Sequence, residues 1–169
     1  TAKYFVPRLL GGFCAQYPDI DIRLEVLNRD GVVQRLREQR DDLAIMSMPP
    51  ADLALDDAVF LPNPLVLIAP AGHALTQQGA LTLDDLCQER FILRERGSGT
   101  RMAADAHFRA AGFRPQVRLE LGSNEAIKEA VAGGLGLSVL SAHTLRGRAR
   151  EHGVQVLPVD GFPIAGHWH

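Results

Sequence analysis

The chain has 169 residues, of which 46% are hydrophobic, 22% are charged and 6% are aromatic, and its formal net charge is −2. These proportions are typical of a globular protein with a substantial core, built as one domain or as two small lobes. Because 18 basic residues are balanced by 20 acidic ones, the chain lacks the positive charge needed to follow a phosphate backbone. Binding of nucleic acid by this chain alone is therefore not expected.

The cysteine content and the hydropathy pattern fit an intracellular protein. Cys14 and Cys87 lie far apart, each in a helix-like apolar setting, and support neither a disulfide framework nor a metal cluster. The sequence contains no apolar run of membrane-spanning length and no signal peptide. Since it begins with Thr1 and stops inside a strand-like segment, we expect a piece of a longer protein.

The first third of the chain is predicted to begin with an amphipathic helix over residues 4–17. Its apolar residues recur every four positions, Pro7 falls in or near the first turn, and Pro18 ends the helix. The elements expected next are a strand over 20–27, a helix over 31–39 and a buried strand over 43–48.

The rest of the chain alternates predicted strands and helices. The strands cover 64–70, 91–94, 117–121, 135–141, 154–159 and 162–169, and the helices cover 82–87, 100–111 and 124–132. The helix over 82–87 has Thr82 as its N-cap and Asp85 three residues later, a weak capping box. Alternation of this kind predicts an α/β fold with mostly parallel strand pairing. One sheet would fit this length, but the proline-bracketed stretches 62–64 and 158–163 favour two lobes with two crossings.

Polar residues follow several of the predicted strands, where ligands gather in parallel α/β sheets. The clusters are Asn28–Arg29, Ser47, Ser98–Thr100 and Ser123–Glu125. Ser98–Thr100 belongs to a Gly-Ser-Gly-Thr turn whose amides, hydroxyls and helix dipole suit an anion. Taken alone, this turn is better interpreted as a plain helix cap formed by Ser98 or Thr100. The glutamates at 95, 120 and 125 are interpreted as solvated or ion-paired.

The sequence carries no motif of an enzyme or of a nucleotide-binding protein. It has no Walker A sequence and no Gly-x-Ser-x-Gly elbow, and Met102 stands where a dinucleotide motif starting at Gly97 would need glycine. His167 and His169 share one strand face, but no carboxylate or cysteine near them in sequence completes a metal site. We therefore expect no catalytic activity, no cofactor and no metal.

Six segments carry a resemblance to a known family. They are TAKYFVPRLL, FCAQYPDIDIRLEVLNRDGV, DDLAIMSMPP, PLVLIAPAGHAL, FILRERGSGTR and SNEAIKEAVAGGLGLSVLS. In this order, and over essentially the whole chain, they resemble the effector-binding domain of LysR-type transcriptional regulators. RERGSGTR and SNEAIKEAVAGGLG are the most specific. The opening TAKYF…PRLL and the stretch DLAIM…PP resemble the subgroup that controls RuBisCO and Calvin-cycle operons.

The resemblance implies an α/β fold akin to type 2 periplasmic binding proteins, with two Rossmann-like lobes joined by two crossover strands and the effector in the cleft. Lobe I would comprise residues 1–62 plus 164–169, and lobe II residues 63–163. The family's first strand would precede Thr1, and its last strand and helix would follow His169, so lobe I is expected to be incomplete.

The resemblance also implies a set of effector-binding positions, which coincide with the polar strand ends. They are Thr1, Asn28, Arg29, Ser47, Ser98, Gly99, Thr100 and Asn124. The subgroup usually has Gly-Arg where this chain has Ser47-Met48, which removes one partner for a phosphate or carboxylate. Arg29 and Arg101 remain as candidate anion partners.

The partners implied by the resemblance are a small anionic metabolite and further copies of the chain. The effector would be a metabolite of carbon fixation or a reduced nicotinamide cofactor, sensed in the cytoplasm without a membrane. Helix 4–17 of one subunit would pair antiparallel with helix 124–132 of another, giving a homodimer or a tetramer; the residues alone favour plain core packing for both faces. DNA would be contacted through a winged helix-turn-helix domain absent from this chain. The alternative is a periplasmic-type solute-binding protein of the same fold, a monomer with a secretory signal.

Overall fold

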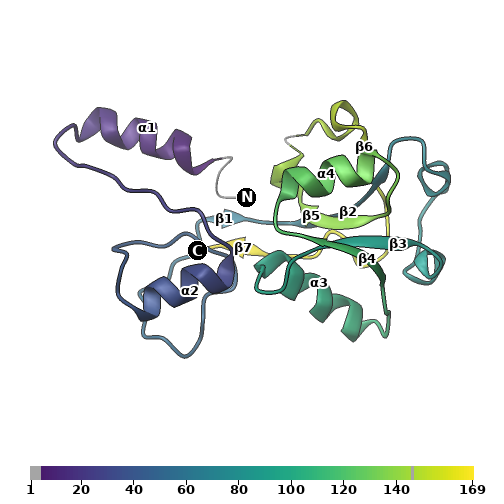
Figure 1. Cartoon of the computed structure of the whole chain (residues 1–169), viewed down its shortest axis with the longest axis horizontal. Helices are drawn as coiled ribbons and strands as arrows, with labels where there is room; N and C mark the ends of the chain where they lie inside the picture. The colour runs from purple at the N-terminus through teal and green to yellow at the C-terminus, as the bar shows by residue number, and fades with distance from the viewer. Residues whose placement is uncertain (1–4, 146) are drawn as a thin grey trace.

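The computed structural model describes residues 5–145 and 147–169 (Figure 1). Its α-helices are α1 (Val6–Gln16), α2 (Arg29–Arg37), α3 (Gly99–Ala110) and α4 (Asn124–Ala132). Its strands are β1 (Leu61–Pro62), β2 (Leu65–Pro70), β3 (Arg90–Arg94), β4 (Gln116–Leu121), β5 (Ser138–Ser141), β6 (Val154–Val156) and β7 (His167–Trp168). Short 3₁₀ helices cover Ala74–Gln77, Asp84–Leu86, Ala142–Thr144 and Ala149–His152.

A three-stranded antiparallel sheet and a two-stranded parallel sheet, which one isolated bridge joins into a mixed sheet layer, form the centre of the C-terminal two-thirds of the molecule. β2 lies between β5 and β6 and pairs antiparallel with both. β3 and β4 pair parallel, and a parallel bridge from Phe91 to Leu137 connects β3 to the residue just before β5. The α/β class is confirmed, but the expected mostly parallel pairing is wrong. Alternation of strands and helices does not fix strand direction, and β2 takes its partners from distant parts of the chain.

Each face of this sheet is covered by one helix and has its own apolar core. Successive strand residues point to opposite faces: Phe91 packs with Phe108 of α3, while its neighbour Ile92 packs with Ile127 and Val131 of α4. Phe91, Ile92 and Ile127 are all fully buried. The apolar face of α4 is therefore core, as the residues alone suggested, and its predicted bounds are those observed.

Residues 5–62 pack less closely. Val6, Val33, Met46 and Pro50 are buried apolar residues of this segment, and α1 lies apart from the sheet (Figure 1). The large apolar residues left exposed in this segment are Leu9, Phe13, Tyr17, Ile20, Ile22, Leu24, Val26, Leu27, Leu43, Met48, Leu55, Val59 and Phe60.

The strands predicted over 20–27 and 43–48 are wrong. A strand needs backbone hydrogen bonds to a neighbour. Among the described residues, 20–27 finds no strand partner, and 43–48 forms only the reciprocal pair between Met46 and His169 at 3.0 and 2.9 Å. Residues 20–27 show the alternating hydrophobicity of a strand, but they lack the backbone hydrogen bonds to a described neighbouring strand that a strand also needs.

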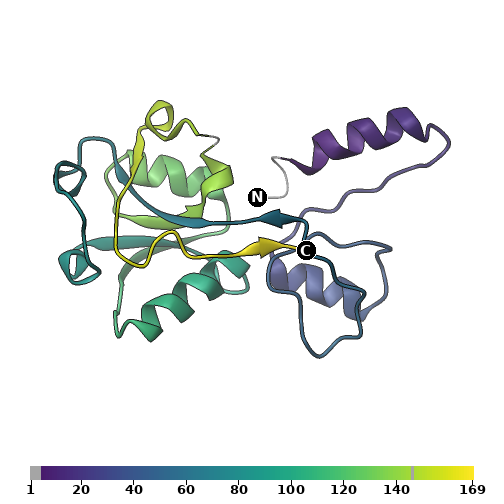
Figure 2. The same cartoon turned by 180° about the vertical axis from the view of Figure 1, so that it is seen from behind.

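Two antiparallel strands connect the two halves of the molecule (Figure 2). β1 pairs with β7, and the pairing continues toward the sheet through reciprocal bonds of 2.9 Å between Leu65 and Ile164. Of the strand predicted over 162–169, only β7 is observed as a strand, and it lies in the connection between the two halves.

The prediction of an α-helix over 82–87 is wrong in the kind and the length of the helix. The structure has a single 3₁₀ turn, Asp84–Leu86, with Leu83 rather than Thr82 at its N-cap. The reciprocal half of the capping box does form, because the Asp85 carboxylate accepts from the Thr82 amide at 2.7 Å and from its hydroxyl at 2.8 Å. A segment this short satisfies its backbone in the tighter helix.

Candidate functional site

The Gly-Ser-Gly-Thr turn begins α3 and lies against the N-terminal half of the molecule. Gly97 has φ +86°, and a Cβ there would lie 2.7 Å from Oδ2 of Asp30. A Cβ on Gly99 would lie 2.6 Å from Oγ of Ser47. The positive φ of Gly97 favours glycine at that position, whereas a side chain at position 99 would oblige the Ser47 hydroxyl to move. Ser98 is the N-cap residue and is buried, but its side chain makes no capping hydrogen bond, so the plain cap interpretation of its hydroxyl is wrong.

The N-terminus of α2 faces this turn. Asn28 caps α2 by accepting from the Gly31 amide at 3.0 Å, and the Asp30 amide donates to the Gly97 carbonyl at 3.1 Å. Arg29 donates from Nε to the Met48 carbonyl at 2.7 Å. Two helix N-termini, those of α2 and α3, thus meet with their partly positive ends close together, an arrangement that favours an anion.

Arg94, which was not among the predicted site residues, completes this region. Arg94, at the end of β3, donates to the Glu95 carboxylate at 2.8 and 3.0 Å and to Oδ1 of Asn124 at 2.8 Å. Asn28 also donates to Glu95, at 3.2 Å. Burial raises the pKa of Glu95, but the bonds from Arg94 and Asn28 outweigh burial and hold this pKa below its ordinary value. The carboxylate is ionised at neutral pH, and it is ion-paired as the sequence suggested.

Two adjoining pockets lie at the junction of the two halves. The smaller has a volume of about 80 Å³ and is lined by Val26, Leu27, Asn28, Arg29, Val32, Ile45, Met46, Ser47, Arg94, Ser98, Gly99, Thr100 and Trp168. Ser47, Gly99 and Thr100 also line the second pocket, so the two adjoin at these residues. Within residues 5–145 and 147–169, no Asp or Glu lines the smaller pocket, which carries two arginines.

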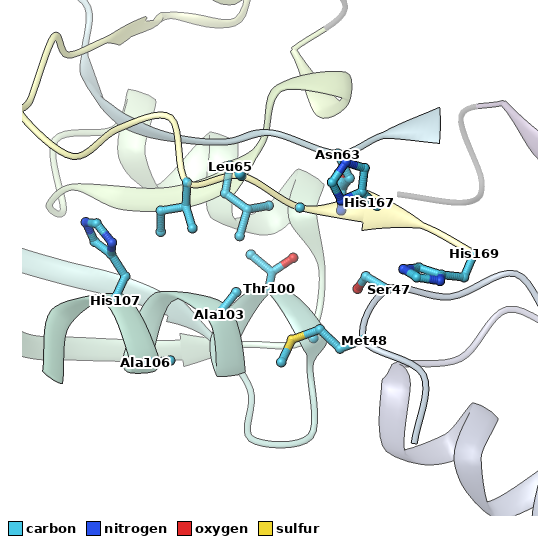
Figure 3. A pocket seen from close by; sticks show the side chains of 14 residues that line it. Ser47, Met48, Asn63, Leu65, Thr100, Ala103, Ala106, His107, His167 and His169 are labelled. Atoms are coloured by element: carbon cyan, nitrogen blue, oxygen red, sulfur yellow. The ribbon is translucent and has the colours of Figure 1, made fainter. Parts of the chain in front are cut away.

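The larger pocket has a volume of about 440 Å³ and lies between α3 and the connecting strands (Figure 3). His107 is at one end and His169 at the other, while Thr100 and Ala103 of α3 face Leu65. Its wall is mostly apolar, with hydroxyl, amide and imidazole groups added by a few side chains. Such a lining suits a small molecule with a few polar groups.

The structure brings most of the predicted effector-binding positions together. Six of them line the smaller pocket: Asn28, Arg29, Ser47, Ser98, Gly99 and Thr100. Asn124 does not line it but holds Arg94, which does. Thr1 lies outside the described residues. The signal that could have identified Arg94 is its place at the end of a strand, three residues before the Gly-Ser-Gly-Thr turn.

Arg101, a second candidate anion partner, is engaged elsewhere. It is buried, donates to Asp105 at 2.9 Å and to the Arg94 carbonyl at 2.8 Å, and pairs with Glu120 at 3.1 Å. Burial lowers the pKa of Arg101, but the bonds to Glu120 and Asp105 more than offset this and raise the pKa above its ordinary value. Arg101 lines neither pocket, and its guanidinium is engaged by Asp105 and Glu120, so the structure gives no support to it as a candidate anion partner.

The paired histidines lie at the larger pocket. His167 and His169 both line it, and Nδ1 of His169 lies 2.8 Å from a carboxylate oxygen of Asp57. A carboxylate is therefore near this pair, which the sequence did not reveal. In the part of the chain that the structure describes, no cluster of three or more metal-ligating side chains is found.

These features define a two-part α/β ligand-binding domain with a polar cleft where its parts meet. The chain matches the family described as the LysR substrate binding domain over residues 1–169, and it belongs to that family. The predicted family and its fold are thereby confirmed.

Relatives place the chain close to regulators of carbon fixation. It is 46% identical over 169 residues to the HTH-type transcriptional activator CmpR of Synechocystis, covering 100% of this chain and 56% of the relative. It is 44% identical to the RuBisCO operon transcriptional regulator of Acidithiobacillus ferrooxidans, covering 100% of this chain and 55% of the relative. The chain thus spans about half the length of these relatives. Both are named as transcriptional regulators rather than enzymes.

A solved structure supports the same placement. The regulatory domain of Synechocystis PCC6803 CcmR, in complex with 2-PG, matches with a TM-score of 0.94 and 47% identity, covering 99% of this chain and 80% of that one. The resemblance to the carbon-fixation subgroup is confirmed by these relatives. Within the described ranges, the structure has no helix both long and apolar enough to cross a membrane.

Proposed function

We propose that this chain is the ligand-sensing and dimerisation domain of a LysR-type transcriptional regulator of carbon-fixation genes, acting in the cytoplasm. Its effector is a small anionic metabolite held in the cleft between lobe I (residues 1–62 plus 164–169) and lobe II (residues 63–163). The observation that carries the proposal is the meeting of Arg29 and Arg94 with two helix N-termini in a pocket without carboxylates among its described lining. The names of the relatives support the regulatory role and disfavour a solute-binding protein.

The two pockets suit chemically different parts of the effector. A volume of about 80 Å³ suits one carboxylate or phosphate group, and the adjoining 440 Å³ pocket has room for the rest of the molecule. Thr100 lies between them and can donate its hydroxyl to either part. The ligand 2-PG of the CcmR structure is the first candidate to test, because that domain is 47% identical to this chain.

Calorimetric titration with 2-PG and a panel of carbon-fixation metabolites tests this site. Arg29→Ala should weaken binding about tenfold or more, because a charged hydrogen-bond donor is lost, and Thr100→Val should weaken it less. Arg37→Ala is the matched control, since it removes the same charge from the other end of α2, where Arg37 pairs with Asp52 on the surface. If both site variants bind the wild-type effector unchanged, the cleft is not the effector site.

The DNA-binding and dimer functions belong to the same proposal. DNA is contacted through a winged helix-turn-helix domain outside this chain, and closure of the two lobes on the effector shifts the geometry of a homodimer or tetramer. Such a shift requires different affinities for two states, of order 1–3 kcal/mol. The apolar face of α1 supports an interface, because Leu9, Phe13 and Tyr17 are 55%, 40% and 45% exposed.

A charge on α1 tests the interface. Phe13→Glu should convert dimers to monomers in sedimentation, since burying a carboxylate between subunits is costly. Ile127, on the proposed partner helix α4, is unsuitable for the same test because it is fully buried within its own subunit. A Phe13→Glu protein that sediments as a dimer would place the interface elsewhere.

A further inference from the structure

The guanidinium of Arg94 is held by a carboxylate in the geometry that it would use for a ligand. Nε donates to Oε2 of Glu95 at 2.8 Å, and Nη2 donates to Oε1 at 3.0 Å. This two-pronged contact is how arginine binds carboxylate and phosphate groups. The Arg94 side chain is 12% exposed and lines the smaller pocket. The guanidinium of Arg94, which faces the cleft, is thus already paired with the carboxylate of the next residue, Glu95.

The Glu95 carboxylate is held from both halves of the molecule. Oε1 accepts from Nδ2 of Asn28 at 3.2 Å, in addition to the bonds from Arg94. Asn28 caps α2 and lines the same pocket. Glu95 therefore takes donors that an anion in the cleft would otherwise receive, and it connects α2 to β3 by doing so.

We propose that Glu95 is an internal anion that occupies Arg94 and Asn28 in the absence of effector and that the carboxylate or phosphate group of the effector displaces it. This inference rests on the proposed function, because it requires an anion to bind in this cleft. It goes beyond that function by giving Glu95, which is absent from the described lining of the pocket, a role in selecting the ligand that Arg94 binds.

Exchange of one anion for another has a physical advantage. A mostly buried guanidinium left without a partner is strongly destabilising, whereas an exchange keeps Arg94 paired in both states. The exchange also sets a threshold, because a ligand must bind Arg94 and Asn28 better than a carboxylate already tethered beside them. Neutral ligands do not meet this condition. Loss of the bond between Asn28 and Glu95 then makes the contact between the two halves depend on the ligand.

Glu95→Gln tests the exchange, because glutamine keeps the size of the side chain and an oxygen that can accept from Asn28 but carries no charge. Calorimetric titration of the 169-residue chain with 2-PG and with inorganic phosphate should show binding about tenfold tighter than in the wild type. Glu151→Gln is the matched control: it removes the same charge from an exposed residue whose partner, Arg148, is also exposed. Its affinities should equal those of the wild type.

The double variant Arg94→Gln/Glu95→Gln shows whether the gain acts through Arg94. Its affinity should fall back to the wild-type value or below. If the double variant keeps the gain, or if Glu151→Gln shows the same gain, the effect is one of overall charge and the exchange is refuted. If the wild type binds and Glu95→Gln binds equally or more weakly, the exchange is wrong but the proposed function stands. If no variant binds either probe, both are overturned.

Discussion

Residues 63–163 and residues 5–62 contain comparable hydrophobic patterns but pack very differently. In the first region, strands β2, β3 and β5 are buried between α3 and α4 and form two apolar cores. In the second, Ile20, Ile22, Leu24 and Val26 alternate as regularly as residues of a strand, yet they are 39–52% exposed and unpaired among the described residues. Alternating apolar residues therefore create the capacity to form a strand, and a neighbouring backbone decides whether one forms.

The candidate effector site lies where these two regions meet. The C-terminal region supplies Arg94, Ser98 and Thr100 from a packed sheet and its helix, while the N-terminal region supplies Asn28 and Arg29 from a helix with little core of its own. A site shared between a tightly and a loosely packed region suits a sensor, because ligand contacts can contribute much of the stability of the looser side.

The largest expected contrast comes from removing one matched side chain in each region. Ile92→Ala should lower the free energy of unfolding by about 2–5 kcal/mol, because Ile92 is fully buried and the change leaves a cavity. Ile22→Ala, at a side chain that is 39% exposed, should cost about 1 kcal/mol or less. Urea denaturation, monitored by circular dichroism, measures the free energy of unfolding of both variants. Equal costs would show that residues 20–27 are as firmly packed as the sheet.

Glycine substitutions give a second, smaller contrast. Gly136 has φ +151°, and a Cβ there would lie 2.3 Å from the Arg90 carbonyl of β3, so Gly136→Ala should destabilise the sheet by about 1–3 kcal/mol. Gly12 lies inside α1, and a Cβ there would meet no atom within 4 Å among the described residues beyond its own helix backbone, so Gly12→Ala should stabilise α1 by up to about 1 kcal/mol. Thermal unfolding reports the first effect and helix content the second. A destabilising Gly12→Ala would mean that α1 is packed on that face.

The smallest expected effect concerns the contact between the regions. The pKa of Glu95 is lowered on folding, so its ionised form contributes stability above the unfolded-state pKa, and this contribution is lost as the pH falls through the folded-state pKa. At pH 7, Glu95→Gln should be less stable than the wild type by about 1 kcal/mol, because glutamine keeps one acceptor for Arg94 and Asn124 supplies another, and the difference should disappear in acid. Denaturation over a pH series measures this, with Glu151→Gln as the charge control. A difference that grows in acid would contradict the account.

The elements of the C-terminal region were predicted well from the sequence because its strands pair with one another and its helices bury their apolar faces against those strands. The strand over 64–70, the helix over 124–132 and the polar strand ends follow from local pattern, and the family resemblance united them into one cleft. Strand direction was missed because it depends on which distant strand becomes the neighbour. Arg94 was missed because its importance arises from Asn28 and Asn124, which lie far from it in the sequence.

An NMR titration of the isotope-labelled chain with 2-PG tests the central claim that the effector binds where the two regions meet. We expect saturable shifts of the amide signals of Asn28 and Arg29 on one side and of Ser98, Gly99 and Thr100 on the other, with a single affinity. Saturable binding whose shifts stay within one region and leave these five amides unchanged would contradict it.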